Sequence, residues 1–256
     1  MRAMDAPTNP LPPTTGAAAT DLHVETWGAG APVLLVHGSL ATGAEEWDAQ
    51  RPLAAAGFRL LVLDRRGYGR SPAAAGEDFL VDAADIAALM GDGAHLVGHS
   101  YGGLGVMFAA AQRPEATLSL ALLEAPATTL AQDDPDWRAL VEGVTRLWDE
   151  DLPDDEWVVR FLTAVGSDPD QLGPDLLAAA VSLVPVFRQG RPFYDREPPL
   201  DELATARFPK LVVSGGHHPG FDAMCAELAG RIGAAHEVIA GAGHEIQFTG
   251  DPVNEA

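Results

Sequence analysis

One serine of this chain stands in a pattern that suits nucleophilic chemistry. Residues 98–102 read Gly-His-Ser-Tyr-Gly, after a short apolar run and before a helix-forming run. In a G-x-S-x-G pattern between a strand and a helix, the backbone turns sharply and exposes the serine hydroxyl. Gly98 and Gly102 have no Cβ, so such a turn closes without collision. The sequence therefore predicts that Ser100 is a nucleophile.

His244 is the histidine that we expect to act as the base for Ser100. A serine hydroxyl needs a base to take its proton as it attacks a carbonyl carbon, and the pKa of histidine lies near neutrality. His244 follows the last expected strand, in the glycine-rich segment 241–244, which would bring it to the same sheet edge as Ser100. We expect His99 to be a packing residue and His37 to hydrogen-bond to backbone.

The chain alternates short apolar runs with helical segments, which predicts an α/β fold with a mostly parallel, doubly wound sheet. We expect strands at 22–27, 32–37, 59–63, 94–97, 118–123, 210–214 and 236–240, and helices at 44–56, 79–90 and 104–112. The alternation stops between Pro126 and Pro209. Helical pieces at 137–148, 156–165 and 174–184 fill this stretch. They predict a cap over the carboxyl edge of the sheet, where α/β sheets bind ligands.

The length of 256 residues fits one large α/β domain. We expect its core at 21–128 and 207–256 and the helical cap at 129–206. Residues 1–20 are rich in Pro, Ala and Thr and are expected to form a disordered tail. At the other end, residues 251–256 begin a final helix, and without its continuation we expect part of the last strand's face to be exposed.

Charge and composition exclude several classes of protein. The formal charge is −21, from 37 acidic and 16 basic side chains, which disfavours nucleic acid and strongly anionic partners. No apolar run approaches the length of a membrane span, and the N-terminus lacks signal-peptide features, so we expect a cytoplasmic protein. The single cysteine, Cys225, excludes an internal disulfide.

No cofactor or metal is expected. Gly67 and Gly69 are not followed by a P-loop lysine, and no dinucleotide-binding pattern opens a helix after the first buried strand. His217 and His218 are adjacent and therefore point in different directions, and no further ligand spacing follows them.

Four segments in this order resemble the α/β-hydrolase family. Val36-His37-Gly38-Ser39 resembles its oxyanion loop, and residues 64–71 (Asp-Arg-Arg-Gly-Tyr-Gly-Arg-Ser) match its loop after the next strand. The elbow at 98–102 and the histidine loop at 241–244 complete the series. The resemblance implies a serine hydrolase that forms an acyl-enzyme. It also implies an oxyanion hole made of the backbone N–H groups of Tyr101 and Ser39, with Leu40 as the alternative to Ser39. The Tyr101 phenol would then be free to touch the substrate.

The third member of a triad is a carboxylate, and here the chain departs from the family. In the family, the usual Asp lies a few residues after the seventh strand. The corresponding loop of this chain reads Gly215-Gly216-His217-His218, and His218 stands where the Asp would be expected. Glu124 is our candidate, because a carboxylate directly after an apolar strand is out of character unless it is paired. We number that strand the sixth, with the cap inserted after it. Certain haloalkane dehalogenases and the lactonases that open zearalenone take their acid from this position. Asp222 is the alternative acid, and an ion pair with a cap arginine is the alternative role for Glu124.

Apolar residues of the cap predict the substrate class. We expect a pocket between the elbow and the cap, which suits a small, uncharged, partly hydrophobic ester or lactone. The expected lining residues are Leu40, Trp137, Trp157, Phe161, Phe187 and Tyr194. Each cap residue could instead belong to the cap's own core. Other chemistry of the same triad (perhydrolysis, C–C cleavage, lyase action) and a non-catalytic binding protein remain as alternatives, and the oligomeric state stays open.

Overall fold

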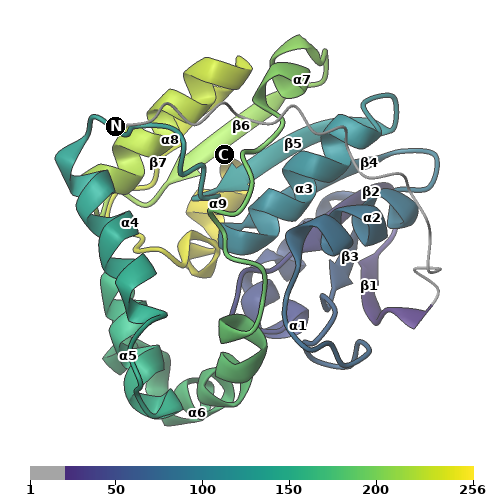
Figure 1. Ribbon diagram of the computed structural model, residues 1–256. Coiled ribbons are helices and arrows are strands. Elements are labelled where there is room, and N and C mark those ends of the chain that lie inside the picture. Colours follow the sequence, from purple (N-terminus) through teal and green to yellow (C-terminus); the bar gives the residue numbers. More distant parts are fainter. Residues whose placement is uncertain (1–20) are drawn as a thin grey trace.

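The computed structural model describes residues 21–256, and the expected tail at 1–20 lies outside them. Within the described residues, one sheet has the strand order β1-β3-β2-β4-β5-β6-β7 (Figure 1). Its strands are β1 (Val24–Gly28), β2 (Ala31–Val36), β3 (Phe58–Leu63), β4 (Ala94–His99), β5 (Thr117–Leu123), β6 (Lys210–Ser214) and β7 (Ala235–Val238). Only β1 runs antiparallel to its neighbour among these pairs. The predicted α/β class with a mostly parallel sheet is confirmed.

Helices cover both faces of the sheet. The core helices are α1 (Gly43–Glu46), η2 (Asp48–Ala56), α2 (Phe79–Leu89), α3 (Ser100–Gln112), α7 (Leu200–Thr205), α8 (Pro219–Ile232), η3 (Ile246–Thr249) and α9 (Asp251–Glu255). The helix predicted at 44–56 is divided into α1 and the 3₁₀ segment η2. Pro52 lies inside η2, and its missing N–H cannot continue α-helical hydrogen bonding.

The strand sequences explain why both faces are covered. Neighbouring residues of β2 point to opposite faces: Leu34 belongs to the core cluster that also contains residues of α2, α3 and α8, and Leu35 to the cluster with Trp47 and Ile246. Both leucines are buried. A strand that is buried on both faces needs a continuous apolar run, which is the pattern that predicted it.

The cap contains three helices, α4 (Pro135–Leu147), α5 (Asp154–Ala164) and α6 (Pro169–Arg188). Figure 1 shows them as an arc that leaves the sheet after β5 and returns before α7. The strand before the cap is thus the fifth of the described chain, not the sixth. Asp134 begins α4 by accepting hydrogen bonds from two backbone N–H groups, and Gly173 bends α6 with a φ of 74°. α7 falls within the expected cap range, but it packs on α8 and α3 of the core.

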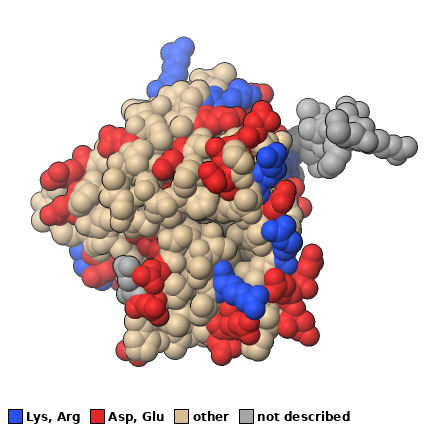
Figure 2. Space-filling model, turned by 90° about the vertical axis from the view of Figure 1, so that its left-hand side faces the viewer, with Lys and Arg blue, Asp and Glu red and all other residues tan. Residues whose placement is uncertain are grey.

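Charge is distributed over the surface. In Figure 2, acidic side chains lie across the face shown, with fewer Lys and Arg among them.

Val238, at the end of β7, is 51% exposed. Among residues 21–256 we find no helix with the length and apolar character that crossing a membrane requires.

The topology brings distant residues to one edge of the sheet. The strands β4, β5, β6 and β7 are mutually parallel neighbours, so their carboxyl ends lie side by side. Ser100 follows β4 directly, Glu124 follows β5, and Gly215 follows β6. His244 lies in the loop after β7. This edge therefore holds the candidate site.

Candidate active site

Ser100 lies at a sharp turn between β4 and α3. Its backbone φ of 48° is in the left-handed region, which residues other than glycine rarely adopt. A Cβ on Gly102 would come within 2.3 Å of the His37 carbonyl oxygen, and one on Gly98 within 2.6 Å of the Val106 side chain. The turn therefore needs glycine at both positions. It leaves Ser100 at the start of α3, half-buried at the edge of the sheet.

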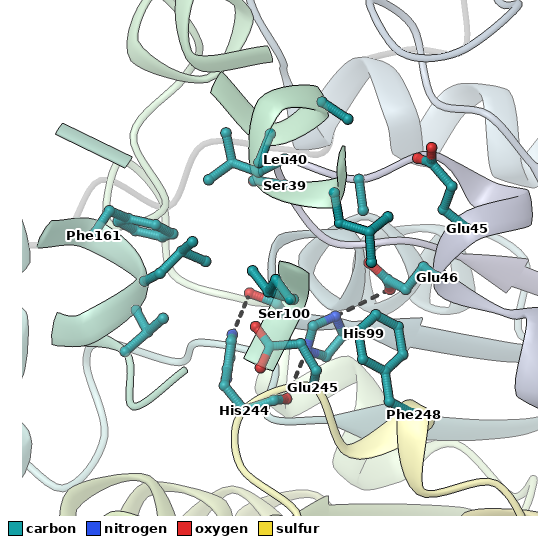
Figure 3. A pocket seen from close by; sticks show the side chains of 17 residues that line it. Ser39, Leu40, Glu45, Glu46, His99, Ser100, Phe161, His244, Glu245 and Phe248 are labelled. Atoms are coloured by element: carbon teal, nitrogen blue, oxygen red, sulfur yellow. Dashed lines mark hydrogen bonds and ion pairs between the residues drawn. The ribbon is translucent and has the colours of Figure 1, made fainter. Parts of the chain in front are cut away.

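Ser100, His244 and Glu124 form one hydrogen-bonded chain. The Ser100 hydroxyl lies 3.0 Å from His244 Nε2 (Figure 3), and His244 Nδ1 lies 2.7 Å from Glu124 Oε2. A carboxylate only accepts hydrogen bonds, so Nδ1 carries the imidazole proton and Nε2 is free to accept from the serine. This is the arrangement in which an imidazole can take the proton of an attacking hydroxyl.

Glu124 is fully buried, and both of its oxygens have partners. Its φ of 44° turns the chain at the end of β5, so that the side chain points along the sheet edge. Oε1 accepts a hydrogen bond of 2.7 Å from the Gly215 N–H, while Oε2 faces His244. The structure thus places Glu124, rather than the alternative Asp222, on Nδ1. His218, at the family's usual acid position, accepts from the Gly220 N–H and begins α8.

Buried charges hold residues 37–39, the segment in which we expect an oxyanion donor. Arg65 donates from Nε to the His37 carbonyl at 3.0 Å and from a terminal nitrogen to the Gly38 carbonyl at 2.8 Å. The Ser39 hydroxyl donates to Glu77 at 2.8 Å, so the backbone N–H is the group that Ser39 has left to offer a substrate. Tyr101 is the second residue of α3, where N–H groups have no partner inside the helix.

Comparisons with known proteins bear on the fold. The model of the alpha/beta hydrolase fold family matches residues 31–155. A crystal structure of an alpha/beta hydrolase from Sphaerobacter thermophilus DSM 20745 aligns with a TM-score of 0.64 and 26% identity, covering 85% of this chain and 88% of that one. The chain belongs to the α/β-hydrolase superfamily.

Two curated proteins are similar to parts of this α/β-hydrolase. A pimeloyl-[acyl-carrier protein] methyl ester esterase from Aeromonas hydrophila is 30% identical over 153 residues, which are 57% of this chain and 59% of the esterase. A non-heme haloperoxidase from Rhodococcus erythropolis is 37% identical over 102 residues, 36% of each chain. The chain thus spans less than two thirds of these relatives, and the matches support a hydrolase with esterase-type and haloperoxidase-type relatives.

Burial governs the electrostatics of this hydrolase's site. Desolvation, followed by the positive charge of His99 nearby, lowers the pKa of His244, which keeps the imidazole neutral and able to accept a proton. Desolvation also raises the pKa of the Glu124 carboxyl. The ring of His217 and the Gly215 N–H oppose that rise. Groups that stabilise an anionic Glu124 are therefore part of the site.

Two cavities meet at Ser100 in the hydrolase. Both are lined by Ser39, Ser100, Phe161, Val165 and His244. The first, shown in Figure 3, is otherwise lined by aliphatic residues, three glutamates, a histidine and a phenylalanine: Leu40, Ala41, Glu45, Glu46, His99, Leu162, Leu172, Leu176, Ala179, Ala180, Glu245 and Phe248. The second is mainly aromatic: Tyr101, Glu124, Pro126, Trp137, Leu140, Val144, Phe187, Phe193 and Phe221.

The cavities correct part of the expected lining. Leu40, Trp137, Phe161 and Phe187 lie in the cavity walls as predicted, but Trp157 lines neither cavity. Its indole is fully buried, stacks on Phe161 and donates to the Leu147 carbonyl. It therefore belongs to the core of the cap.

Tyr194 and the Tyr101 phenol also differ from expectation. Tyr194 is 41% exposed and lines neither cavity, whereas its neighbour Phe193 does. Phe221, which the sequence analysis did not single out, lines the aromatic cavity as well. The Tyr101 hydroxyl donates to the Arg191 carbonyl at 2.8 Å, so it is occupied by the protein. The sequence did contain a signal for Phe221: it is a bulky aromatic residue in the first turn of α8, directly after the loop that carries His217 and His218.

No group of three or more His, Cys, Asp or Glu side chains within 21–256 is arranged to hold a metal ion.

His37 bonds to backbone as predicted: Nδ1 faces the Gly38 carbonyl, and Nε2 accepts a hydrogen bond from the Arg65 backbone N–H.

Arg65→Met is expected to destabilise the hydrolase. The guanidinium is buried with Glu77 at 2.8 Å and Asp82 at 2.9 Å, so its removal leaves two carboxylates without a counter-charge in a dry site. Breaking a buried ion pair costs about 3–5 kcal/mol, which corresponds to a melting temperature roughly 10 °C lower for a domain of this size. Arg70→Met is the matched control, since Arg70 is 64% exposed and should change Tm little. Equal melting temperatures for the two variants would contradict this account.

His99 is paired with a buried carboxylate, Glu46. His99 Nδ1 lies 3.0 Å from Glu46 Oε1, and Nε2 lies 2.9 Å from the His244 carbonyl oxygen. Both nitrogens face acceptors, so the protonated ring satisfies both contacts. Burial alone would lower the pKa of His99, but Glu46, together with Glu245 and the His244 carbonyl, outweighs that effect, and the net direction is upward. The charged ring thereby ties the elbow to the loop that carries His244 (Figure 3).

The stability that His99 provides should depend on pH. A histidine whose pKa is raised on folding stabilises the folded state fully below its unfolded pKa of about 6.5. That contribution disappears as the pH rises through the folded pKa. We therefore expect the Tm difference between wild type and His99→Gln to be largest near pH 6 and to shrink toward pH 9. Thermal unfolding across this range measures it, and a difference that grows with pH would refute the assignment.

Proposed function

We propose that this protein is a serine hydrolase that cleaves a carboxylic ester or lactone through an acyl-enzyme intermediate. The observation that carries the proposal is the hydrogen-bonded chain from Ser100 through His244 to Glu124. The esterase similarity of part of the chain supports it.

The mechanism follows from the positions of these atoms. As Ser100 Oγ attacks the carbonyl carbon, its proton passes to His244 Nε2, and Glu124 stabilises the resulting imidazolium. The carbonyl oxygen becomes an oxyanion that faces the N–H groups of Tyr101 and the oxyanion loop, each donor being worth roughly 10²- to 10³-fold in rate. His244 then gives its proton to the leaving oxygen. A water then loses a proton to the same nitrogen as it attacks the acyl carbon, and His244 passes that proton to Ser100 Oγ as the carboxylic acid leaves.

The cavity walls define the proposed substrate class. Neither cavity beside Ser100 is lined by Lys or Arg, and most of the lining is apolar. An uncharged, partly hydrophobic ester fits such a site, and a lactone undergoes the same attack because it is a cyclic ester. The acidic surface fits a protein without a nucleic acid partner, and we propose a cytoplasmic location without a membrane partner.

Perhydrolysis is the alternative that a specific observation favours. The haloperoxidase similarity covers 36% of this chain. In that chemistry, hydrogen peroxide replaces water in attacking the acyl-enzyme, so the triad and the first half-reaction are unchanged. Comparing peracid and acid production from one ester in the presence of peroxide separates the two functions.

The test is pre-steady-state hydrolysis of p-nitrophenyl butyrate. The proposal predicts a burst of p-nitrophenol equal to the enzyme concentration, and a butyryl adduct on the peptide that contains Ser100 after acid quench. Hydrolysis without such an adduct, or binding without turnover, would refute it.

A further inference from the structure

His217 approaches the oxygen of Glu124 that does not face His244. Its Nδ1 lies 3.4 Å from Glu124 Oε1, and its Nε2 lies 3.0 Å from the carbonyl oxygen of Val165, at the end of α5. The side chain is only 10% exposed, and Nδ1 is buried without a hydrogen-bond partner. The imidazole therefore stands between the cap and the acid.

The two contacts fix where protons must lie. The Val165 carbonyl only accepts hydrogen bonds, so Nε2 of His217 carries a hydrogen. A neutral ring would then place a bare Nδ1 lone pair 3.4 Å from the anionic Glu124 Oε1, which is unfavourable in a dry site. A proton on His217 Nδ1 or on Glu124 removes this repulsion. His99 stands likewise between a carboxylate and a carbonyl, with a hydrogen bond of 3.0 Å to the carboxylate.

The cap segment after α5 is shaped to make these contacts. A Cβ on Gly166 would come within 2.2 Å of the His217 ring, and the φ of Gly166 is +82°. Ser167, one residue further along, donates its hydroxyl to Glu245, next to His244. The segment 165–167 thus touches both the loop of His217 and the loop of His244, so a change in the position of the cap would alter contacts at both loops.

We propose that His217 is a positioning residue: its imidazolium is the counter-charge that holds Glu124 anionic and links the acid to the docked cap. The inference rests on the proposed function, because it assigns a role to the acid of that reaction. With His217 charged, Glu124 accepts hydrogen bonds from Gly215 and His244 and has a cation 3.4 Å from Oε1. An anionic Glu124 is the form that can orient His244 and stabilise its charged state.

The other titratable groups around His217 are consistent with this role. His244 and His218 have ring centroids 6.4 Å from that of His217. His218 uses Nδ1 to accept the Gly220 N–H, away from Glu124. Asp222, in the first turn of α8, adds negative charge near Glu124, and its Oδ1 is buried without a hydrogen-bond partner. A second carboxylate close to the buried Glu124 makes a cation more necessary.

The test of this role is the pH profile of His217→Gln. Glutamine can still donate to the Val165 carbonyl, but it carries no charge. Loss of a cation within 4 Å of a carboxylate raises its pKa by about one unit or more. We expect the acid limb of kcat/KM for p-nitrophenyl butyrate to move upward by about one pH unit. Activity should fall about tenfold at pH 6 and approach that of wild type toward pH 9, as Glu124 becomes ionised in both proteins.

The matched control is His218→Asn. Asparagine can begin α8 as His218 does, so the pH profile of this variant should coincide with that of wild type. A His217→Gln profile that is lower at every pH but unshifted would overturn the proposal, because a merely structural contact would act in that way. An unshifted profile with full activity would overturn it as well.

A second measurement does not depend on esterase activity. Long-range ¹H–¹⁵N spectra of the histidine rings report which nitrogens are protonated. Signals from both protonated nitrogens of His217 at pH 6, assigned by their absence in His217→Gln, are expected. A bare Nδ1 at pH 6 would overturn the proposal even in an active enzyme. If wild type instead fails to hydrolyse any ester while His217 is doubly protonated, the proposed function fails and the charge assignment stands.

Discussion

Ser100→Ala is expected to lower kcat/KM for p-nitrophenyl butyrate by at least about 10³-fold and to abolish the burst. The His244 imidazole would remain in place, but no hydroxyl would lie within 3.0 Å of Nε2 to form the acyl bond. Because the substitution removes no contact of the buried core, we expect the fold, and with it the far-UV circular dichroism spectrum, to be unchanged. The residual rate measures what the rest of the site contributes by binding and polarising the ester.

The matched control for this loss is Ser182→Ala. Ser182 is an exposed serine of α6 whose hydroxyl bonds to the Ala179 carbonyl. We expect its activity to lie within about twofold of wild type, as for most surface substitutions. Retention of the burst by Ser100→Ala would mean that another nucleophile forms the adduct, and the triad would then be misassigned.

The elbow could be predicted from the sequence because its requirements are local. Gly98 and Gly102 are needed by contacts within a few residues of Ser100 and by the packing of the neighbouring strand. The strands were recognisable for a similar reason, since burial on both faces demands an unbroken apolar run. Glu124 was found as an exception to that rule: a charge at the end of a buried strand requires a partner.

The lining of the cavities could not be predicted in the same way. The apolar face of a cap helix is visible in its periodicity, but the sequence does not say whether a given side chain meets another helix or empty space. Trp157 and Phe161 lie on the same helix and stack on each other, yet only Phe161 reaches the cavities. Tyr194 and Phe193 are adjacent, and the residue that lines a cavity is Phe193, not the expected Tyr194.

The supporting charges were also out of reach of sequence reasoning. Glu46 meets His99, and Glu77 meets Ser39 and Arg65, between segments that only the sheet topology brings together. In a pattern-based interpretation, each of these carboxylates looks like a surface residue. The same holds for His217, whose contact with Glu124 depends on how the β6 loop turns.

Glu124→Gln is expected to lower kcat by about 10⁴-fold, while Asp222→Asn stays within a few fold of wild type. Glutamine has nearly the same shape, so it preserves the packing of the buried site, but it carries no charge to stabilise the imidazolium of His244. Its amide can also donate to Nδ1, which would move the imidazole proton to Nε2 and remove the acceptor that Ser100 needs. Steady-state kinetics of both variants with p-nitrophenyl butyrate measure the effect. Because His244 Nδ1 lies 2.7 Å from Glu124, a loss confined to the Asp222 variant would show that the acid in action differs from the one in contact.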